Sequence, residues 1–84
     1  MNVLKTTQQD RCDPLCEVSE GQLCAVAALE GSKVLCRQLR EMGVRERASL
    51  RIVRRGRNYV CLVGGMRIAL SCQYVSCIFV NREI

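Results

Sequence analysis

The sequence predicts a small, partly open β-barrel with one α-helix packed across an end. Residues 33–42 have helical periodicity and marked ends, and they follow a single predicted strand. The remainder consists of short apolar or alternating runs joined by glycine-containing turns, which is typical of strands. With only 84 residues, two separate sheets would leave many unpaired edges, and a sheet curled into a barrel has fewer.

The first third of the chain divides into an arm and a strand. Residues 1–11 are polar and lack periodicity, so we expect a flexible arm in front of a single domain over residues 12–84. Residues 22–29 (QLCAVAAL) are apolar, with Leu23, Val26 and Leu29 as anchors, and they predict the first strand.

The helix is predicted by apolar residues that would line one of its faces and by a capping residue at each end. Leu35, Leu39 and Met42 recur at helical spacing and would share one face. Ser32 is suited to cap the N-terminus through its hydroxyl group. Gly43 follows at the position where a left-handed residue commonly ends a helix.

The second half of the chain is predicted to be β-structure with one helical turn at residues 71–75. Four strands are expected, at residues 48–53, 59–63, 66–70 and 76–80. The run YVCLV at residues 59–63 is almost entirely apolar and indicates a strand buried on both faces. Gly64 and Gly65 predict a tight hairpin turn between the second and third of these strands.

Composition excludes several classes of function. The chain has no His, so Ser–His and Cys–His catalysis and His-ligated zinc are impossible within one subunit. No phosphate-binding glycine loop is present, and we expect no enzymatic activity. The longest uncharged run, residues 68–81, is too short and too polar for a membrane-spanning helix. Residues 1–13 contain no apolar signal segment, which favours a cytoplasmic protein without membrane insertion.

The seven cysteines are odd in number and form no CxxC pair, which fits reduced thiols in a cytosol. Three of them lie in apolar runs and are expected in the core: Cys24, Cys61 and Cys77.

Cys12 and Cys16 differ because their segment is polar. Their thiolates could hold Fe²⁺ or Zn²⁺ if Asp10, Asp13 or a second subunit supplied further ligands. The alternative interpretation is two ordinary thiols in a mobile arm.

The positive charge is concentrated in residues 37–67, where nine arginines face only two glutamates. Arginine favours planar contacts with carboxylates or phosphates, so the partner is expected to be an acidic protein surface, nucleic acid or anionic lipid headgroups. The candidate partner-binding residues are Arg37 and Arg40 on the helix, and Arg51, Arg54 and Arg55 on the following strand.

Two segments resemble the signatures of the ferrous iron transport protein A (FeoA) family. The first is Leu35-x-Arg37-x-Leu39-x-x-Met42-Gly43-Val44, and the second is VGGMRIAL at residues 63–70. The resemblance covers about residues 12–82. The sequence departs from the family at Arg45-Glu46-Arg47, where members usually carry Pro-Gly.

The resemblance implies an SH3-like barrel of about five strands that acts in ferrous iron uptake beside a membrane permease with a cytosolic GTP-binding domain (FeoB). The family implies no catalytic residues. The leading hypothesis is therefore an adaptor that binds this permease. Nucleic-acid binding is a weaker alternative because Tyr59, Tyr74 and Phe79 are the only aromatic side chains. A cysteine-based metal protein is a third alternative, and exposed sheet edges make a homodimer conceivable.

Overall fold

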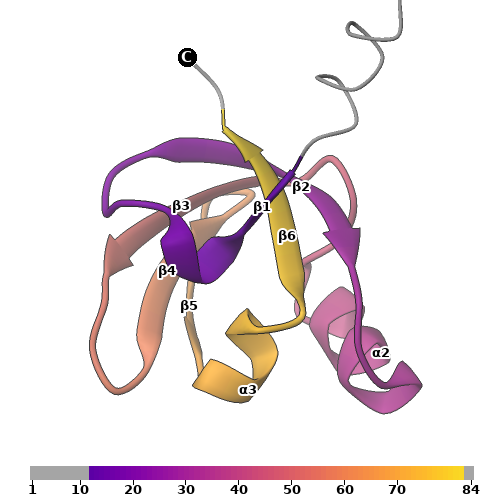
Figure 1. Cartoon of the computed structure of the whole chain (residues 1–84). Coiled ribbons are helices and arrows are strands. Elements are labelled where there is room, and N and C mark those ends of the chain that lie inside the picture. Colours follow the sequence, from indigo (N-terminus) through magenta and orange to yellow (C-terminus); the bar gives the residue numbers. More distant parts are fainter. Residues whose placement is uncertain (1–11, 83–84) are drawn as a thin grey trace, which may run out of the picture.

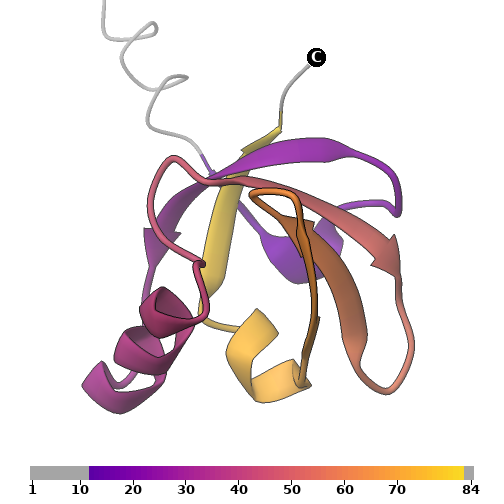
Figure 2. The ribbon, with the colours of Figure 1, turned by 180° about the vertical axis from the view of Figure 1, so that it is seen from behind.

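The computed structural model describes residues 12–82, which form one six-stranded antiparallel sheet curled into an open barrel (Figures 1 and 2). The strand order across the sheet is β1-β6-β2-β3-β4-β5. The elements are β1 (Asp13–Pro14), η1 (Leu15–Glu17), β2 (Leu23–Leu29), α2 (Lys33–Glu41), β3 (Ser49–Arg54), β4 (Tyr59–Val63), β5 (Met66–Leu70), α3 (Cys72–Val75) and β6 (Ile78–Arg82). The predicted mainly β fold with one principal helix is confirmed.

Three details of the strand prediction were wrong. A sixth strand, β1, pairs with β6 through Asp13 and Pro14, and two residues are too few to show periodicity. The last strand, β6, begins at Ile78 and extends to Arg82. The apolar strand β4 is not buried on both faces, because its alternate side chains Val60 and Leu62 are only half-buried. The proposed flexible arm, residues 1–11, lies outside the described residues.

The core fills the concave side of the sheet. Its buried side chains come from the strands, from η1 and from both helices, and they include Leu15, Leu39, Leu50, Ile52, Leu70 and Ile78. Cys24, Cys61 and Cys77 are also buried, which confirms their prediction as core residues. Burial raises the pKa of the Cys61 thiol to about 11, because a thiolate would lose its hydration there.

Helix α2 crosses the lower end of the barrel in Figure 1, and its ends match the sequence prediction. The Ser32 hydroxyl accepts a hydrogen bond from the Leu35 amide at 3.1 Å, and Gly43 has a φ of 98°. The Tyr74 hydroxyl of α3 donates to Gln38 Oε1 of α2 at 2.6 Å, so the two helices are also joined directly.

The loop from α2 to β3 contains a strained residue. Arg47 has a φ of 75°, in the left-handed region of backbone conformation that residues other than glycine rarely adopt. Its amide donates to the carbonyl oxygen of Val26 at 2.8 Å, which holds the loop against β2. Arg47 thus makes a turn that glycine would make without strain.

We expect Arg47→Gly to raise the free energy of unfolding by up to about 1 kcal/mol, because a strain of about 1–2 kcal/mol outweighs the roughly 0.5–1 kcal/mol of backbone entropy that glycine loses. Arg57→Gly is the matched control, because Arg57 is an exposed loop arginine without a positive φ. Urea unfolding should show this control to be neutral or destabilised. Equal destabilisation of both variants would contradict the assignment of strain to Arg47.

The raised pKa of Cys61 predicts a loss of stability in alkali. Between pH 9 and about 11 the thiol ionises in the unfolded chain but stays protonated in the folded chain. The free energy of unfolding therefore falls as the pH rises through this window, and the contribution is fully present below it. Chemical unfolding of Cys61→Val under reducing conditions should lack this component. If the free energy of unfolding fell equally with pH in both proteins, Cys61 would not be the source of the alkaline loss of stability.

Candidate protein-binding surface

The chain has no acidic residue between Arg47 and Arg82. This part supplies strands β3, β4 and β5, and three of its arginines are exposed on them, namely Arg51, Arg54 and Arg67. No side-chain hydrogen bond or ion pair within residues 12–82 involves these three guanidinium groups. The convex side of the sheet is therefore strongly positive without local neutralisation.

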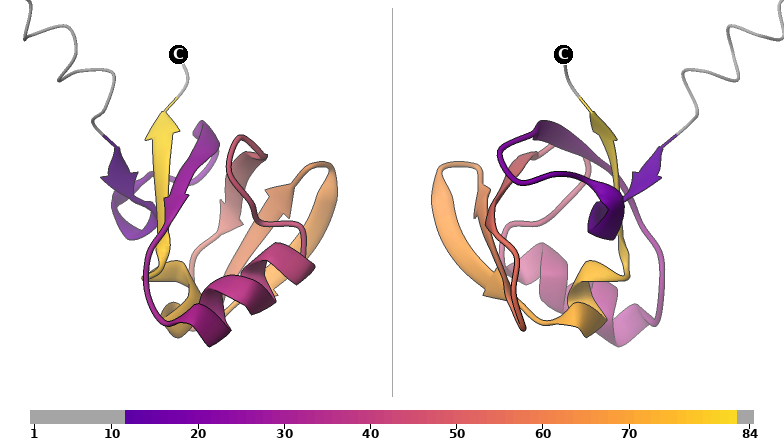
Figure 3. Two further views of the ribbon diagram at one scale, coloured as in Figure 1. Left: turned by 90° about the vertical axis from the view of Figure 1, so that its right-hand side faces the viewer. Right: turned by 60° about the vertical axis from the view of Figure 1, so that its left-hand side comes forward.

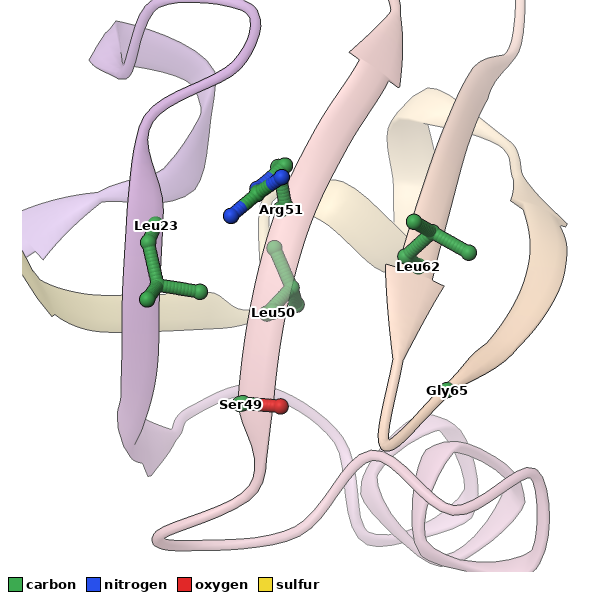
Figure 4. A pocket seen from close by; sticks show the side chains of 6 residues that line it. All are labelled: Leu23, Ser49, Leu50, Arg51, Leu62 and Gly65. Carbon is green, nitrogen blue, oxygen red and sulfur yellow. The ribbon is translucent and has the colours of Figure 1, made fainter.

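The strand register places two of these arginines in one row with leucines. Leu23 of β2 is opposite Arg51 of β3, Arg51 is opposite Leu62 of β4, and Leu62 is opposite Arg67 of β5. Residues opposite each other on neighbouring strands share a face. Figure 4 shows Leu23, Arg51 and Leu62 beside one another on adjacent strands. Apolar and guanidinium side chains thus alternate across four strands.

Shallow hollows lie along this row. One, of about 240 Å³, is lined by Leu23, Ser49, Leu50, Arg51, Leu62 and Gly65 (Figure 4). A second, of about 310 Å³, is lined by Val53, Arg54, Val60 and Arg67. We call the surface that joins them the β3–β5 face, and define it as Leu23, Arg51, Val53, Arg54, Val60, Leu62 and Arg67.

A β-bulge widens the apolar part of this face. The pairing of β3 with β4 shifts between Ile52 and Arg54, so Val53 is an extra residue. Val53 and Leu23 remain 38% and 37% exposed, although large apolar side chains are usually buried. Exposed apolar side chains surrounded by arginines are typical of a surface that binds another protein.

Arg55 is engaged within the chain. It lies beyond the end of β3, and its guanidinium donates to the carbonyl oxygens of Cys16 and Val18 and to the Tyr59 hydroxyl. The same group lies 5.5 Å from the centre of the Tyr59 ring. The hydrogen bond with Tyr59 raises the pKa of Arg55. These contacts tie the loop after β3 to η1.

The predicted helix arginines, Arg37 and Arg40, lie on α2. Arg37 is exposed, and Arg40 forms an ion pair with Glu46 at 3.1 Å. The pKa of Glu46 is lowered, mainly by a backbone hydrogen bond and to a smaller extent by the hydrogen bond from Arg40. Both partners are about half exposed, so this pair contributes little to stability.

Within residues 12–82, the two cysteines proposed as metal ligands do not belong to a larger cluster of ligands. Cys12 is half-buried and Cys16 is exposed, and no group of three or more Cys, Asp or Glu side chains in residues 12–82 could hold a metal ion. Asp10, their possible third ligand, lies outside the described residues. Cys12 lines a separate hollow with Arg47 and Asn81.

The aromatic side chains do not form a stacking surface for bases. Tyr59, Tyr74 and Phe79 are all half-buried, and Tyr59 and Tyr74 hydrogen-bond within the chain. Among residues 12–82, no helix has the length and apolar character needed to cross a membrane.

Sequence reasoning missed several residues of the β3–β5 face. Arg67 belongs to the basic stretch but is absent from the predicted binding residues, although its alternation with Met66 and Ile68 indicates that it faces away from them. Leu62 and Val60 were assigned to the core, because an apolar run alone does not reveal that only one face is covered.

Comparison with known proteins places the chain in a family. The FeoA domain matches residues 14–82. A crystal structure of an iron uptake regulatory protein (FeoA) has a TM-score of 0.79 and 22% identity, covering 87% of this chain and 99% of that one. The solution structure of FeoA from Chlorobium tepidum has a TM-score of 0.77 and 20% identity, covering 84% and 70%.

A manganese-dependent transcriptional repressor also shares the fold, with a TM-score of 0.81 and 17% identity. The match covers 86% of this chain but 37% of the repressor, so the fold is one part of that larger protein. No curated protein matched the chain. Because the family match spans nearly all of the described residues, the chain belongs to the FeoA domain family.

Proposed function

We propose that this protein is a small cytosolic adaptor that regulates ferrous iron uptake by binding the GTP-binding domain of a membrane ferrous iron permease of the FeoB type. Membership in the FeoA family implies involvement in ferrous iron uptake. The finer proposal rests on the β3–β5 face, where three arginines that have no side-chain partner within residues 12–82 surround exposed apolar side chains.

The chemistry of this face favours an acidic protein partner. An acidic partner surface would be attracted to Arg51, Arg54 and Arg67 before contact, which raises the association rate. The exposed Leu23 and Val53 would then lose their contact with water in the complex, which stabilises it. The same partner could also contact α2, where Arg37 is exposed and Arg40 is paired with Glu46.

Nucleic acid fits this face less well. Its phosphates would suit the arginines, but the exposed part of the face is aliphatic and the aromatic side chains are half-buried. An acidic protein surface uses both the charged and the apolar side chains of the face.

We expect the double variant Arg51→Glu/Arg54→Glu to weaken binding to the permease's cytosolic GTP-binding domain by at least about tenfold, or ~1.4 kcal/mol, at low ionic strength. Binding by the starting protein should itself weaken as salt rises, because screening shortens the range of these charges. Surface plasmon resonance at two salt concentrations measures both effects.

Arg57→Glu is the control, because it reverses the charge of an exposed arginine outside the β3–β5 face. It should lose clearly less affinity than the double variant. The proposal fails if the starting protein does not bind the domain at low salt, or if the control weakens binding as much as the double variant does.

A further inference from the structure

The two edges of the sheet are unlike. At one edge, β1 has only two residues, and its first residue, Asp13, forms an ion pair with Arg82 of β6 at 3.2 Å. At the other edge, β5 has five residues and, among residues 12–82, pairs only with β4. Figure 3 shows the β4–β5 hairpin at the outer margin of the molecule in both views. The β5 edge is therefore open to a further strand.

The register identifies the backbone groups on this open edge. Gly64 and Gly65, with φ of 57° and 90°, form a two-residue turn flanked by Val63 and Met66. The flanking pair of such a hairpin is hydrogen-bonded, and bonded and non-bonded pairs then alternate along the ladder. Arg67 and Ala69 belong to the non-bonded pairs, so their N–H and C=O groups point away from β4.

The core is incomplete along the same edge. Met66 and Ile68 lie opposite Val63 and Cys61, so all four side chains point to the concave side of the sheet. Val63 and Cys61 are 5% and 0% exposed, whereas Met66 is 65% exposed and Ile68 is half-buried. An added strand would place its own side chains beside Met66 and Ile68 and extend the core by one strand.

On the convex side, the side chains of an added strand would lie beside Arg67 of β5. No acidic side chain occurs in residues 47–82, so Arg67 and the nearby Arg54 would attract carboxylates on the added strand. A second copy of this chain is a poor occupant, because pairing two β5 edges would bring two such arginine-rich faces together. Charge therefore selects an acidic strand from another protein.

We propose that the β5 edge accepts an extended segment of the partner in which acidic and apolar residues alternate, the acidic side chains lying beside Arg67 and the apolar ones over Met66 and Ile68. This inference rests on the proposed function and assigns the partner's mode of contact. Main-chain hydrogen bonds to Arg67 and Ala69 would supply affinity, and the alternation would supply specificity.

The test uses amide hydrogen exchange, followed by NMR, with a short capped peptide that alternates Glu and Val as the probe. In the free protein the Arg67 and Ala69 amides should exchange rapidly. Saturating peptide should slow both by at least about tenfold, or ~1.4 kcal/mol. A peptide N-methylated at the amides that face β5 should not protect them, whereas one methylated at the opposite amides should.

Ala69→Pro tests the edge from the protein side. The Ala69 N–H points away from β4, so proline removes a donor from the open edge and leaves the β4–β5 ladder intact. It should lower affinity for both the peptide and the permease's GTP-binding domain by at least about tenfold. Ala69→Ser keeps the N–H and should bind as the starting protein does, and circular dichroism verifies that both variants fold.

The outcomes separate this inference from the proposed function. If Arg51→Glu/Arg54→Glu weakens binding to the permease domain but Ala69→Pro does not, the edge proposal is overturned and the adaptor function stands. If the peptide binds the edge but the permease domain does not bind at all, the adaptor function is overturned instead. Protection of Arg67 and Ala69 that grows with protein concentration alone would show a second copy at the edge and would overturn the acidic-strand proposal.

Discussion

The structure depends on the burial of one face of a single sheet. Within residues 12–82, the concave side, closed by α2 and α3, forms the core, and the convex side is in contact with water. Half-buried Val60 and Leu62 and exposed Val53 show that the convex side is partly apolar. Three arginines, on β3 and β5, keep this surface hydrated, and they give it the charge through which it could recognise a partner.

The sequence predicted the elements whose signals are local. Ser32 and Gly43 marked both ends of α2, and Gly64-Gly65 marked the hairpin, because caps and turns are determined by a few adjacent residues. The two-residue strand β1 had no such signal, because it exists only through its pairing with β6. The burial of β4 was overestimated because an apolar run does not reveal how many faces the fold covers.

The candidate surface was predicted only in part, because the charge of a segment is visible in the sequence whereas the pairing of its strands is not. The excess of arginine in residues 37–67 was visible in the sequence, and Arg51 and Arg54 lie on the β3–β5 face. Arg55, which directly follows the end of β3, instead contacts η1 and Tyr59. Arg67 joins the face only through the register of β3, β4 and β5, which depends on contacts distant in the sequence.

We expect this FeoA-family protein to meet its partner at the convex side of β3–β5. The most direct measurement is NMR chemical-shift mapping of the ¹⁵N-labelled protein on addition of the permease's cytosolic GTP-binding domain. The perturbed amides should cluster at Leu23, Arg51, Leu62 and Arg67. Perturbations confined to β1, β6 and the outer side of α2 would contradict it.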